Sequence, residues 1–157
     1  MQGFSLEERI LRLEDIEAIK QLKATYCFCV DDGEIDALME RFTDDAVWDG
    51  GPMGRFEGRE AIRAFLRALP EQLSFALHWV MNPHISVDGD VATGRWYLVE
   101  PCTTAGSGRA IWGAGRYEER YVRRDGEWKF QKVKLTPIFW TPYDEGWGKR
   151  RSVLETI

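Results

Sequence analysis

Hydrophobic positions recur every three or four residues along the N-terminal part of the chain. This spacing is carried by Leu6, Ile10, Leu13, Ile16, Ile19, Leu22, Tyr26 and Cys29. It predicts one long amphipathic helix, because such positions share one face of an α-helix. Ser5 followed by Glu8 forms a capping box and places the helix start there. We expect the helix to end between Asp31 and Gly33.

Two shorter helices and a strand are expected next. A helix over residues 35–41 precedes a strand through residues 46–48, and a Gly/Pro turn follows at residues 50–54. A third helix is predicted from Arg59, and we expect Pro70 to stop it. Its apolar face carries Ile62, Phe65, Leu66 and Leu69.

The hydrophobic period changes from about four to two after the third helix. A single strand is expected from Ser74 onward, with alternate residues on opposite faces. One face would carry Phe75, Leu77, Trp79 and Met81, and the other Ala76, His78 and Val80. On this pattern His78 lies in the middle of a strand with apolar neighbours, so its imidazole is expected to be buried.

Three longer strands complete the pattern. They are expected over residues 91–101, 110–124 and 127–140, and Asp-Gly turn signals stand at residues 88–90 and 125–126. The result is a meandering antiparallel sheet. Strands of this length must curl, so the sheet and the three preceding helices predict an α+β fold in which a cone-shaped barrel encloses a pocket.

Length and charge narrow the classes of function. The chain has 157 residues and a net charge of −5, with both signs scattered along it. This size fits one domain over residues 1–157. Nucleic acid is not an expected partner, since phosphate binding needs a basic face. No apolar run resembles a secretory signal or a membrane span, so a cytoplasmic protein without membrane association is expected.

Aromatic residues and cysteines bear on what the pocket could hold. The chain carries seven Trp, five Tyr and eight Phe. They fit either an aromatic core or a pocket for a hydrophobic or ring-bearing small molecule. On the second interpretation, the expected substrate-binding residues are Glu100, Trp48, Trp96, Trp112 and Phe139. The chain has three cysteines, of which Cys27 and Cys29 have C-x-C spacing. This set does not match a zinc site, and no metal site is expected.

His78 and an aspartate at the end of the first helix are the candidate acid/base groups. A buried imidazole needs a partner for each ring nitrogen. Asp31 and Asp32 stand where the helix dipole disfavours a carboxylate. Either an ordinary Asp-Asp-Gly turn and a core histidine stand here, or one carboxylate accepts the Nδ1 hydrogen of His78 and orients it for proton transfer. The other histidine, His84, stands near a strand end and is not expected to act directly.

Two further residues could face the same pocket. Glu100 shares a strand face with apolar residues, and a desolvated carboxyl there would hold its proton more tightly. Tyr26 lies on the apolar stripe of the first helix, either as a core residue or as a donor to a substrate oxygen. Residues five positions apart point in different directions on a regular helix. Tyr26 and Asp31 are therefore expected to share a cavity only if the last turn of the helix loosens. No nucleophile elbow, phosphate loop or dinucleotide fingerprint is present, so acid/base chemistry without a cofactor is expected.

Five segments, in this order and at this spacing, resemble the SnoaL-like branch of the nuclear transport factor 2-like superfamily. They are DIEAIKQLK at residues 15–23, YCFCVD at 26–31, FTDDAVW at 42–48, ATGRWYL at 92–98 and YVRRDGEWKF at 121–130. The likeness is greatest to bile acid 7-alpha-dehydratase. Scytalone dehydratase and hexachlorocyclohexane dehydrochlorinase are more distant cousins.

The resemblance implies roles for particular residues. It implies a cone-shaped, cystatin-like fold and a catalytic dyad of Asp31, in preference to Asp32, with His78. Tyr26 matches the tyrosine that helps to position or protonate the leaving group in the bile acid enzyme. Glu100 takes the place of an aspartate in that enzyme.

The resemblance also implies a homo-oligomer, with a trimer favoured. At one position this sequence differs from the bile acid enzyme. Pro137 stands where the bile acid enzyme has an arginine, so that substrate is not expected here. The expected function is cofactor-independent elimination from a small cyclic or aromatic substrate, with loss of water, halide or an aldehyde such as formaldehyde. A ketosteroid-isomerase-type proton shuttle and a non-catalytic binding domain are the alternatives.

Overall fold

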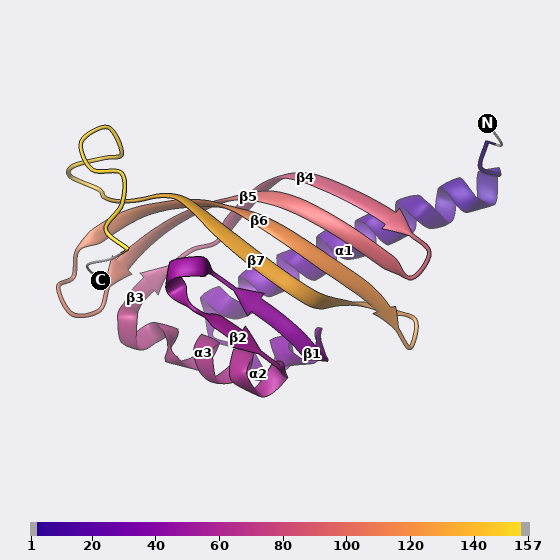
Figure 1. Cartoon of the computed structure of the whole chain (residues 1–157), viewed down its shortest axis with the longest axis horizontal. Coiled ribbons are helices and arrows are strands. Elements are labelled where there is room, and N and C mark those ends of the chain that lie inside the picture. Colours follow the sequence, from indigo (N-terminus) through magenta and orange to yellow (C-terminus); the bar gives the residue numbers. More distant parts are fainter. Residues whose placement is uncertain (1–2, 155–157) are drawn as a thin grey trace.

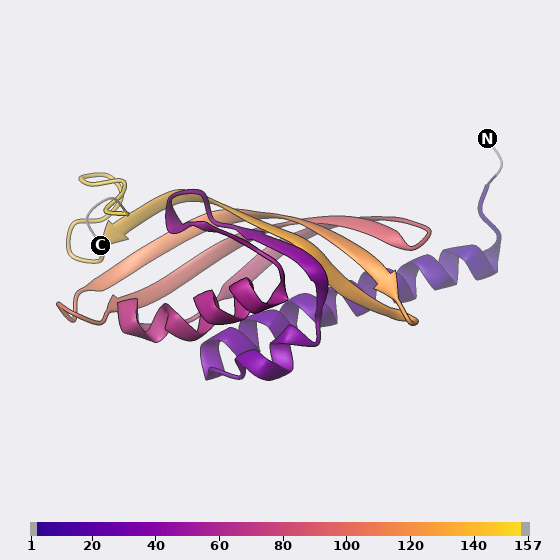
Figure 2. The same cartoon turned by 60° about the horizontal axis from the view of Figure 1, so that its bottom comes forward.

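A computed structural model describes residues 3–154 and shows a curled sheet with helices on one side (Figures 1 and 2). The helices are α1 (Leu6–Asp32), α2 (Ile35–Met39), the 3-10 turn η1 (Gly51–Met53) and α3 (Arg59–Gln72). The strands are β1 (Phe42–Asp49), β2 (Arg55–Glu57), β3 (Leu73–Ala76), β4 (Trp79–Asp88), β5 (Val91–Thr104), β6 (Ala110–Arg124) and β7 (Glu127–Pro142). The α+β fold predicted from the sequence is confirmed.

The sheet is an open half-barrel with one parallel pair. Its strands follow the order β2-β1-β7-β6-β5-β3, and β4 also pairs with β5. Strands β4 to β7 form the expected antiparallel meander. Strand β1 lies parallel to β7, which the expectation of a purely antiparallel sheet missed. That pairing returns the chain from the helices to the sheet edge farthest from β3.

The first helix begins and ends as its capping residues predict. The Ser5 hydroxyl accepts the Glu8 amide at 3.1 Å, and the Glu8 carboxylate accepts the Ser5 amide at 2.7 Å. Gly33 adopts a left-handed conformation with φ 76°, and its amide donates to Val30 and Cys29 carbonyls. Glycine takes that conformation without steric cost. Asp31 and Asp32 therefore occupy the last turn of α1.

The apolar stripe of α1 is buried only in its second half. Ile19, Leu22 and Tyr26 lie in the core, whereas Leu6 and Leu13 are 69% and 66% exposed. The first turns of the helix extend beyond the end of the sheet (Figure 1). Hydrophobic spacing predicts an apolar face on the helix, but it does not indicate how much of that face the sheet covers.

Two local predictions differ from the structure. Pro70 lies inside α3, and the Leu73 amide still donates to the Leu69 carbonyl beyond it. A proline removes its own amide hydrogen bond, but the amides that follow it can still donate, and the helix continues to Gln72. The strand expected from Ser74 onward is also interrupted, because residues 77 and 78 belong to neither β3 nor β4.

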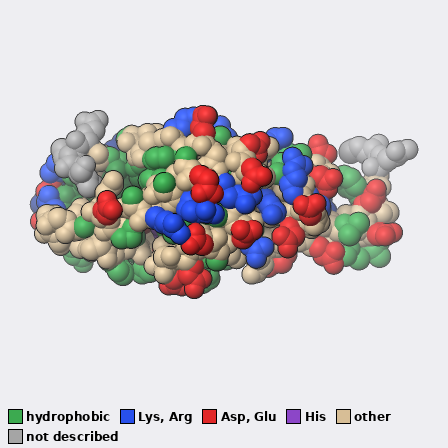
Figure 3. Space-filling view, turned by 90° about the horizontal axis from the view of Figure 1, so that it is seen from below, with side chains coloured by type: hydrophobic (Ala, Val, Ile, Leu, Met, Phe, Trp, Pro, Cys, Tyr) green, Lys and Arg blue, Asp and Glu red, His purple; other side chains and the backbone are tan. Residues whose placement is uncertain are grey.

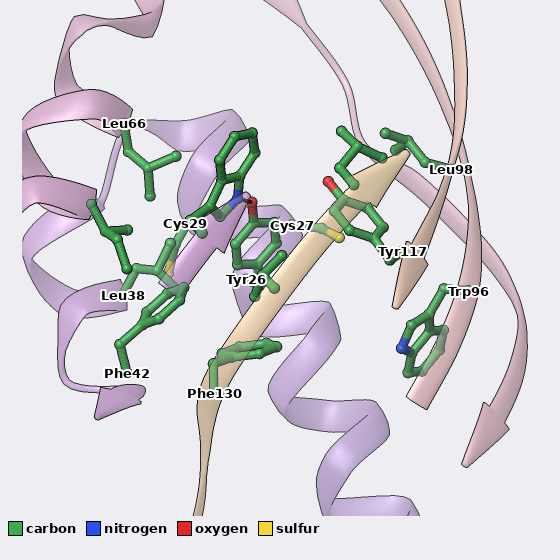
Figure 4. Close-up of a cluster of buried hydrophobic side chains, with 14 of the residues drawn as sticks. Tyr26, Cys27, Cys29, Leu38, Phe42, Leu66, Trp96, Leu98, Tyr117 and Phe130 are labelled. Carbon is green, nitrogen blue, oxygen red and sulfur yellow. Dashed lines mark hydrogen bonds between the residues drawn. The ribbon is translucent and has the colours of Figure 1, made fainter. Parts of the chain in front are cut away.

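Aromatic rings fill the space between α1 and the sheet (Figure 4). The Phe130 ring lies 5.1 Å from Phe42 and 5.6 Å from Tyr26, measured between ring centroids. Cys27, Cys29 and Cys102 are buried as free thiols. Within residues 3–154, no helix has the length and hydropathy that a membrane span requires.

Charged side chains of both signs are interspersed over the face shown in Figure 3. Ion pairs also link neighbouring elements of the protein, such as Arg67 of α3 with Asp36 of α2 at 2.5 Å. Exposed pairs of this kind contribute little stability. We see no continuous basic patch on this face.

Replacement of Gly113 by alanine should destabilise the sheet where β6 meets β7. A Cβ atom there would lie 2.7 Å from the buried Trp140 ring, so the indole would have to move. Overpacking of this kind typically costs about 1–3 kcal/mol. We expect thermal unfolding at a lower temperature in Gly113→Ala. Gly106→Ala, where no atom lies within 4 Å of the added Cβ, is the matched control and should melt close to the parent. Equal melting of the two variants would contradict the packing described here.

Candidate active site

Asp31 and His78, 47 positions apart in the sequence, meet at the C-terminal end of α1. The Asp31 Oδ1 atom lies 2.7 Å from His78 Nδ1. The same carboxylate accepts the backbone amide of His78, at 3.0 Å to Oδ2 and 3.2 Å to Oδ1. Only 13% of the Asp31 side chain and 8% of the His78 side chain are exposed. The carboxylate therefore holds both the backbone and the ring of His78.

The break between β3 and β4 creates this arrangement. The Leu77 amide still donates to the Pro101 carbonyl of β5 at 3.2 Å. The His78 amide turns instead to Asp31, so it leaves the hydrogen-bond ladder of the sheet. The sequence prediction of a continuous strand through His78 is wrong for this reason, although the imidazole is buried as expected.

The contacts to His78 compensate for the unfavourable position of Asp31. A carboxylate at the negative end of a helix dipole is disfavoured by about 0.3–1 kcal/mol. Hydrogen bonds to a charged group contribute about 1.5–3 kcal/mol each. Two donors on His78 therefore outweigh the dipole. They also assign the tautomer, with the hydrogen on Nδ1 and the lone pair on Nε2.

Glu100 lies on the other side of the imidazole. Its Oε2 atom is 3.8 Å from His78 Nε2, and only 6% of its side chain is exposed. Burial raises the pKa of Glu100, and Asp31 raises it further, while His78 opposes the shift. The carboxyl therefore holds its proton more tightly than an exposed glutamate does. His78 therefore stands between the Asp31 carboxylate, which orients it, and the Glu100 carboxyl, which keeps a proton that it could donate in a reaction.

Tyr26 reaches the same site from α1. Its hydroxyl oxygen accepts the Trp48 indole hydrogen at 3.0 Å, and its ring meets the His78 ring edge-to-face with centroids 6.3 Å apart. Burial raises the pKa of Tyr26 far above its ordinary value, so the phenol keeps its hydrogen. The last turn of α1 stays helical through Asp32. The loosening expected from the five-residue spacing is not needed, because His78 reaches across to Asp31.

A cavity of about 500 Å³ brings these groups together. The polar side chains of Tyr26, Asp31, His78, Glu100 and Tyr117 line it. Its apolar wall includes Trp48, Phe65, Leu66, Leu135, Trp140 and Leu154. Arg67 is the one Lys or Arg among the lining residues that the structure describes, and its guanidinium is bound to Asp36. The cavity thus offers an uncharged substrate a largely apolar chamber.

Three aromatic residues predicted to bind substrate lie away from this cavity. Trp96 is buried farther along β5 and donates to the Tyr121 hydroxyl at 3.0 Å. Trp112 packs against Trp79 with centroids 6.3 Å apart, and Phe139 stacks on Trp147 at 5.0 Å. Trp112 and Phe139 follow the alternation of their strands to the face opposite Gly113 and Trp140. Sequence period alone does not say which face is concave.

Tyr117 and Trp140 line the cavity but escaped the sequence analysis. Tyr117 lies on β6, and its ring centroid is 6.2 Å from that of Tyr26. The sequence signal for Tyr117 was its alternation with Glu119 and Tyr121. Alternate residues of a strand share one face, and in this sheet that face is the inner one. In the described part of the chain, no group of three or more His, Cys, Asp or Glu residues is arranged to hold a metal ion.

Comparisons with known proteins agree with this architecture. The chain is 28% identical over 132 residues to an uncharacterised protein of Mycobacterium tuberculosis, covering 83% of this chain and 90% of that protein. It is 26% identical over 133 residues to gamma-hexachlorocyclohexane dehydrochlorinase of Sphingobium indicum, covering 83% and 85% of the two chains.

Solved structures show the same likeness. A crystal structure of a hexachlorocyclohexane dehydrochlorinase matches with a TM-score of 0.78 at 26% identity, over 83% of this chain and 90% of that one. A scytalone dehydratase-like protein of Novosphingobium aromaticivorans shares the fold, with a TM-score of 0.77 at 23% identity over 83% and 89% of the chains. The likeness to bile acid 7-alpha-dehydratase stays a prediction. A model of the SnoaL-like domain family matches residues 11–134. The chain therefore belongs to the SnoaL-like domain family of the nuclear transport factor 2-like superfamily.

Proposed function

We propose that this protein is a cofactor-independent lyase that eliminates a small fragment from a neutral cyclic or aromatic substrate. One observation carries the proposal: Asp31 holds His78 at 2.7 Å through Nδ1, which leaves Nε2 beside the cavity as a base. A positioned general base of this kind contributes roughly 10² to 10⁴ in rate. The family relationship supports a lyase, since the dehydrochlorinase relative is named for an elimination.

The reaction begins with proton abstraction by neutral His78. Its Nε2 takes a proton from a carbon next to the leaving group or an activating carbonyl or phenol, and the electrons of that C–H bond form a new double bond. The leaving group departs with its own bonding pair. Asp31 stabilises the imidazolium that forms, as an orienting carboxylate does in hydrolase triads.

Glu100 and Tyr26 act on the departing side. Protonated Glu100 gives its proton to the leaving group, while the Tyr26 hydroxyl donates a hydrogen bond to the departing or enolate oxygen. The imidazolium of His78 then returns its proton to Glu100, whose Oε2 lies 3.8 Å from Nε2. This return restores the starting protonation of both groups without a cofactor.

The shape and charge of the cavity support the substrate class. Aromatic walls of Trp48, Phe65 and Trp140 suit a flat or cyclic compound. Arg67, which lines the cavity, is bound to Asp36, and the Asp31 carboxylate would repel a carboxylate on the substrate. Water and halide can leave in this step. Loss of formaldehyde from an aromatic alcohol would instead begin with removal of the hydroxyl proton, and the ring carbon would keep the electrons of the broken C–C bond and take up a proton; we propose to test all three.

A proton-shuttling isomerase is the second candidate. The observation in its favour is the placement of His78 and Glu100 on one cavity, where one group could take a proton and the other return it elsewhere on the same substrate. Isomerisation leaves the mass of the product unchanged, whereas elimination lowers it. A screen of neutral aromatic alcohols and cyclic halides with a mass readout separates the two. A passive binding domain would change none of these compounds and would not exchange their hydrogens with D₂O.

Association with copies of itself is also part of the proposed picture. Trp79, Tyr97 and Ile138 are exposed on the sheet, on strands β4, β5 and β7. Exposed apolar surface of this kind is typical of interfaces. We propose a homo-oligomer, with a trimer favoured, in a cytoplasmic setting.

Replacement of His78 by alanine should lower turnover at least a hundredfold, because the base is removed. Far-ultraviolet circular dichroism should stay at the parent level, since the fold is built from the sheet and α1. His84→Ala is the matched control: His84 is exposed on β4 and should leave turnover unchanged. Near-full activity in His78→Ala would exclude the proposed base.

Tyr26→Phe should lower kcat by about 10², the effect of losing one donor to a developing oxyanion. The variant keeps the ring that packs against Phe130 and loses only the hydroxyl. Steady-state kinetics would separate this effect from binding, because KM should change less than kcat. Tyr97→Phe, on an exposed tyrosine, serves as the control. Equal kcat in the two variants would remove Tyr26 from the mechanism.

Glu100→Gln should stabilise the protein more at pH 8 than at pH 4. The pKa of Glu100 is raised above its ordinary value of 4.5, mainly by burial, so the folded state binds this proton more tightly than the unfolded state. The resulting stability is fully present below about pH 4.5 and is lost as the pH rises through the raised value. Glutamine cannot ionise and keeps it. Melting temperatures of both proteins across this range would test the sign, and a difference that did not grow with pH would contradict it.

A further inference from the structure

A buried ion pair lies behind the wall of the cavity. Lys23 Nζ on α1 lies 2.5 Å from Glu119 Oε1 on β6, and neither side chain is exposed to solvent. A buried pair of this kind is weak evidence for stability, because removing both charges from water costs about as much as their attraction returns. Its presence next to a reaction site calls for another explanation.

The ammonium group of Lys23 is enclosed by aromatic rings. It lies 3.4 Å from the centroid of the Tyr117 ring, 4.3 Å from that of Tyr26 and 6.0 Å from that of Phe130. Cations over ring faces at these distances are attracted to the π electrons, more strongly where water is absent. Glu119 completes the enclosure, and its other oxygen accepts the Tyr121 hydroxyl. Three aromatic rings and one carboxylate therefore surround the ammonium group.

The two rings nearest to Lys23 carry the only phenols that line the cavity among the described residues. Figure 4 shows the hydroxyl groups of Tyr26 and Tyr117 directed to the same end of the cluster, away from Phe42 and Phe130. Tyr26 accepts a hydrogen bond through its oxygen from the Trp48 indole, at 3.0 Å. Its own hydrogen is therefore left for a group in the cavity. Tyr117 stands beside it as a second donor.

We propose that Lys23 is a positioning residue that holds the Tyr26 and Tyr117 rings as a pair of hydrogen-bond donors for a substrate oxygen. The inference rests on the proposed function, since the oxygen is that of the leaving group or enolate. Lys23 touches no substrate itself. It lies under both ring faces, so the two hydroxyls keep a fixed separation and direction when negative charge develops between them. Donors arranged in advance in a dry site are worth more than donors that must reorient.

The test uses 4-nitrophenol, whose phenolate form is coloured and mimics an oxyanion. Titration of the probe bound to the parent protein gives its apparent pKa in the cavity. Lys23→Met keeps the length of the side chain and removes the charge. We expect the apparent pKa of the bound probe to rise by about one unit or more, a tenfold loss in ionisation constant, because the paired donors are no longer aligned. Tyr117→Phe should shift it in the same direction.

Asp15→Asn is the matched control. Asp15 lies two turns earlier on α1 and pairs with Arg123 of the sheet at 2.8 Å, away from the cavity. Its loss should lower the melting temperature without moving the pKa of the bound probe. A purely structural role for Lys23 predicts the same result for Lys23→Met, namely lower stability with an unchanged probe titration, and that result would overturn the inference.

A second variant covers failure of Lys23→Met to fold. The double variant Lys23→Met with Glu119→Gln leaves no lone charge in the core and keeps an acceptor for Tyr121. It should show the same rise in the apparent pKa of the probe, and an unchanged value would again reject the role. The probe needs no turnover. An active elimination with an unshifted probe would therefore reject only the inference, and a shifted probe without any elimination would reject only the proposed function.

Discussion

The Asp31 carboxylate holds His78 at two points, the backbone amide and the ring Nδ1, and the rest of the site is arranged around this contact. The helix α1 has to end where it does, so that its last turn presents Asp31 to the sheet. The sheet has to release one amide between β3 and β4, so that His78 can turn toward α1. The sheet gives up one ladder hydrogen bond and the helix places a carboxylate at the negative end of its dipole, and the hydrogen bonds of the almost buried Asp31 compensate for both.

Burial then differentiates the two acidic groups beside the imidazole. Asp31 receives hydrogen bonds from the backbone amide and the ring of His78. Glu100 is the less exposed of the two, with 6% of its side chain exposed against 13% for Asp31, and burial raises its pKa. Two carboxylic groups with different surroundings can divide the work of orientation and proton donation, as pairs of titratable groups do in many acid/base enzymes. The family fold supplies the chamber, and the chemistry that we propose depends on these residues.

Much of this architecture could be predicted from the sequence. The capping box at Ser5, the glycine after Asp32 and the turn at Asp125 are local signals, and each stands where the structure has it. The meander also follows from period-two spacing. The break at His78 could not be predicted, because it depends on a carboxylate 47 positions away. The parallel pairing of β1 with β7 is likewise a long-range contact that no local pattern encodes.

The sequence predicted the polar residues of the candidate site better than the aromatic residues that line its cavity. A histidine among apolar neighbours and a carboxylate at a helix end both conflict with local preference, and such conflicts mark functional positions. Trp112 and Phe139 could not be excluded in the same way, since either face of a curled sheet can be the concave one. Lys23 could not be predicted as a site residue, because a lysine in a helix agrees with local preference and only its neighbours in space set it apart.

Nuclear magnetic resonance of ¹⁵N-labelled histidine tests the central contact most directly. The account predicts that neutral His78 carries its hydrogen on Nδ1, with a strongly deshielded proton signal that disappears in Asp31→Asn. An Nε2–H tautomer, or a signal indifferent to residue 31, would show that the carboxylate does not orient this ring and would contradict the account.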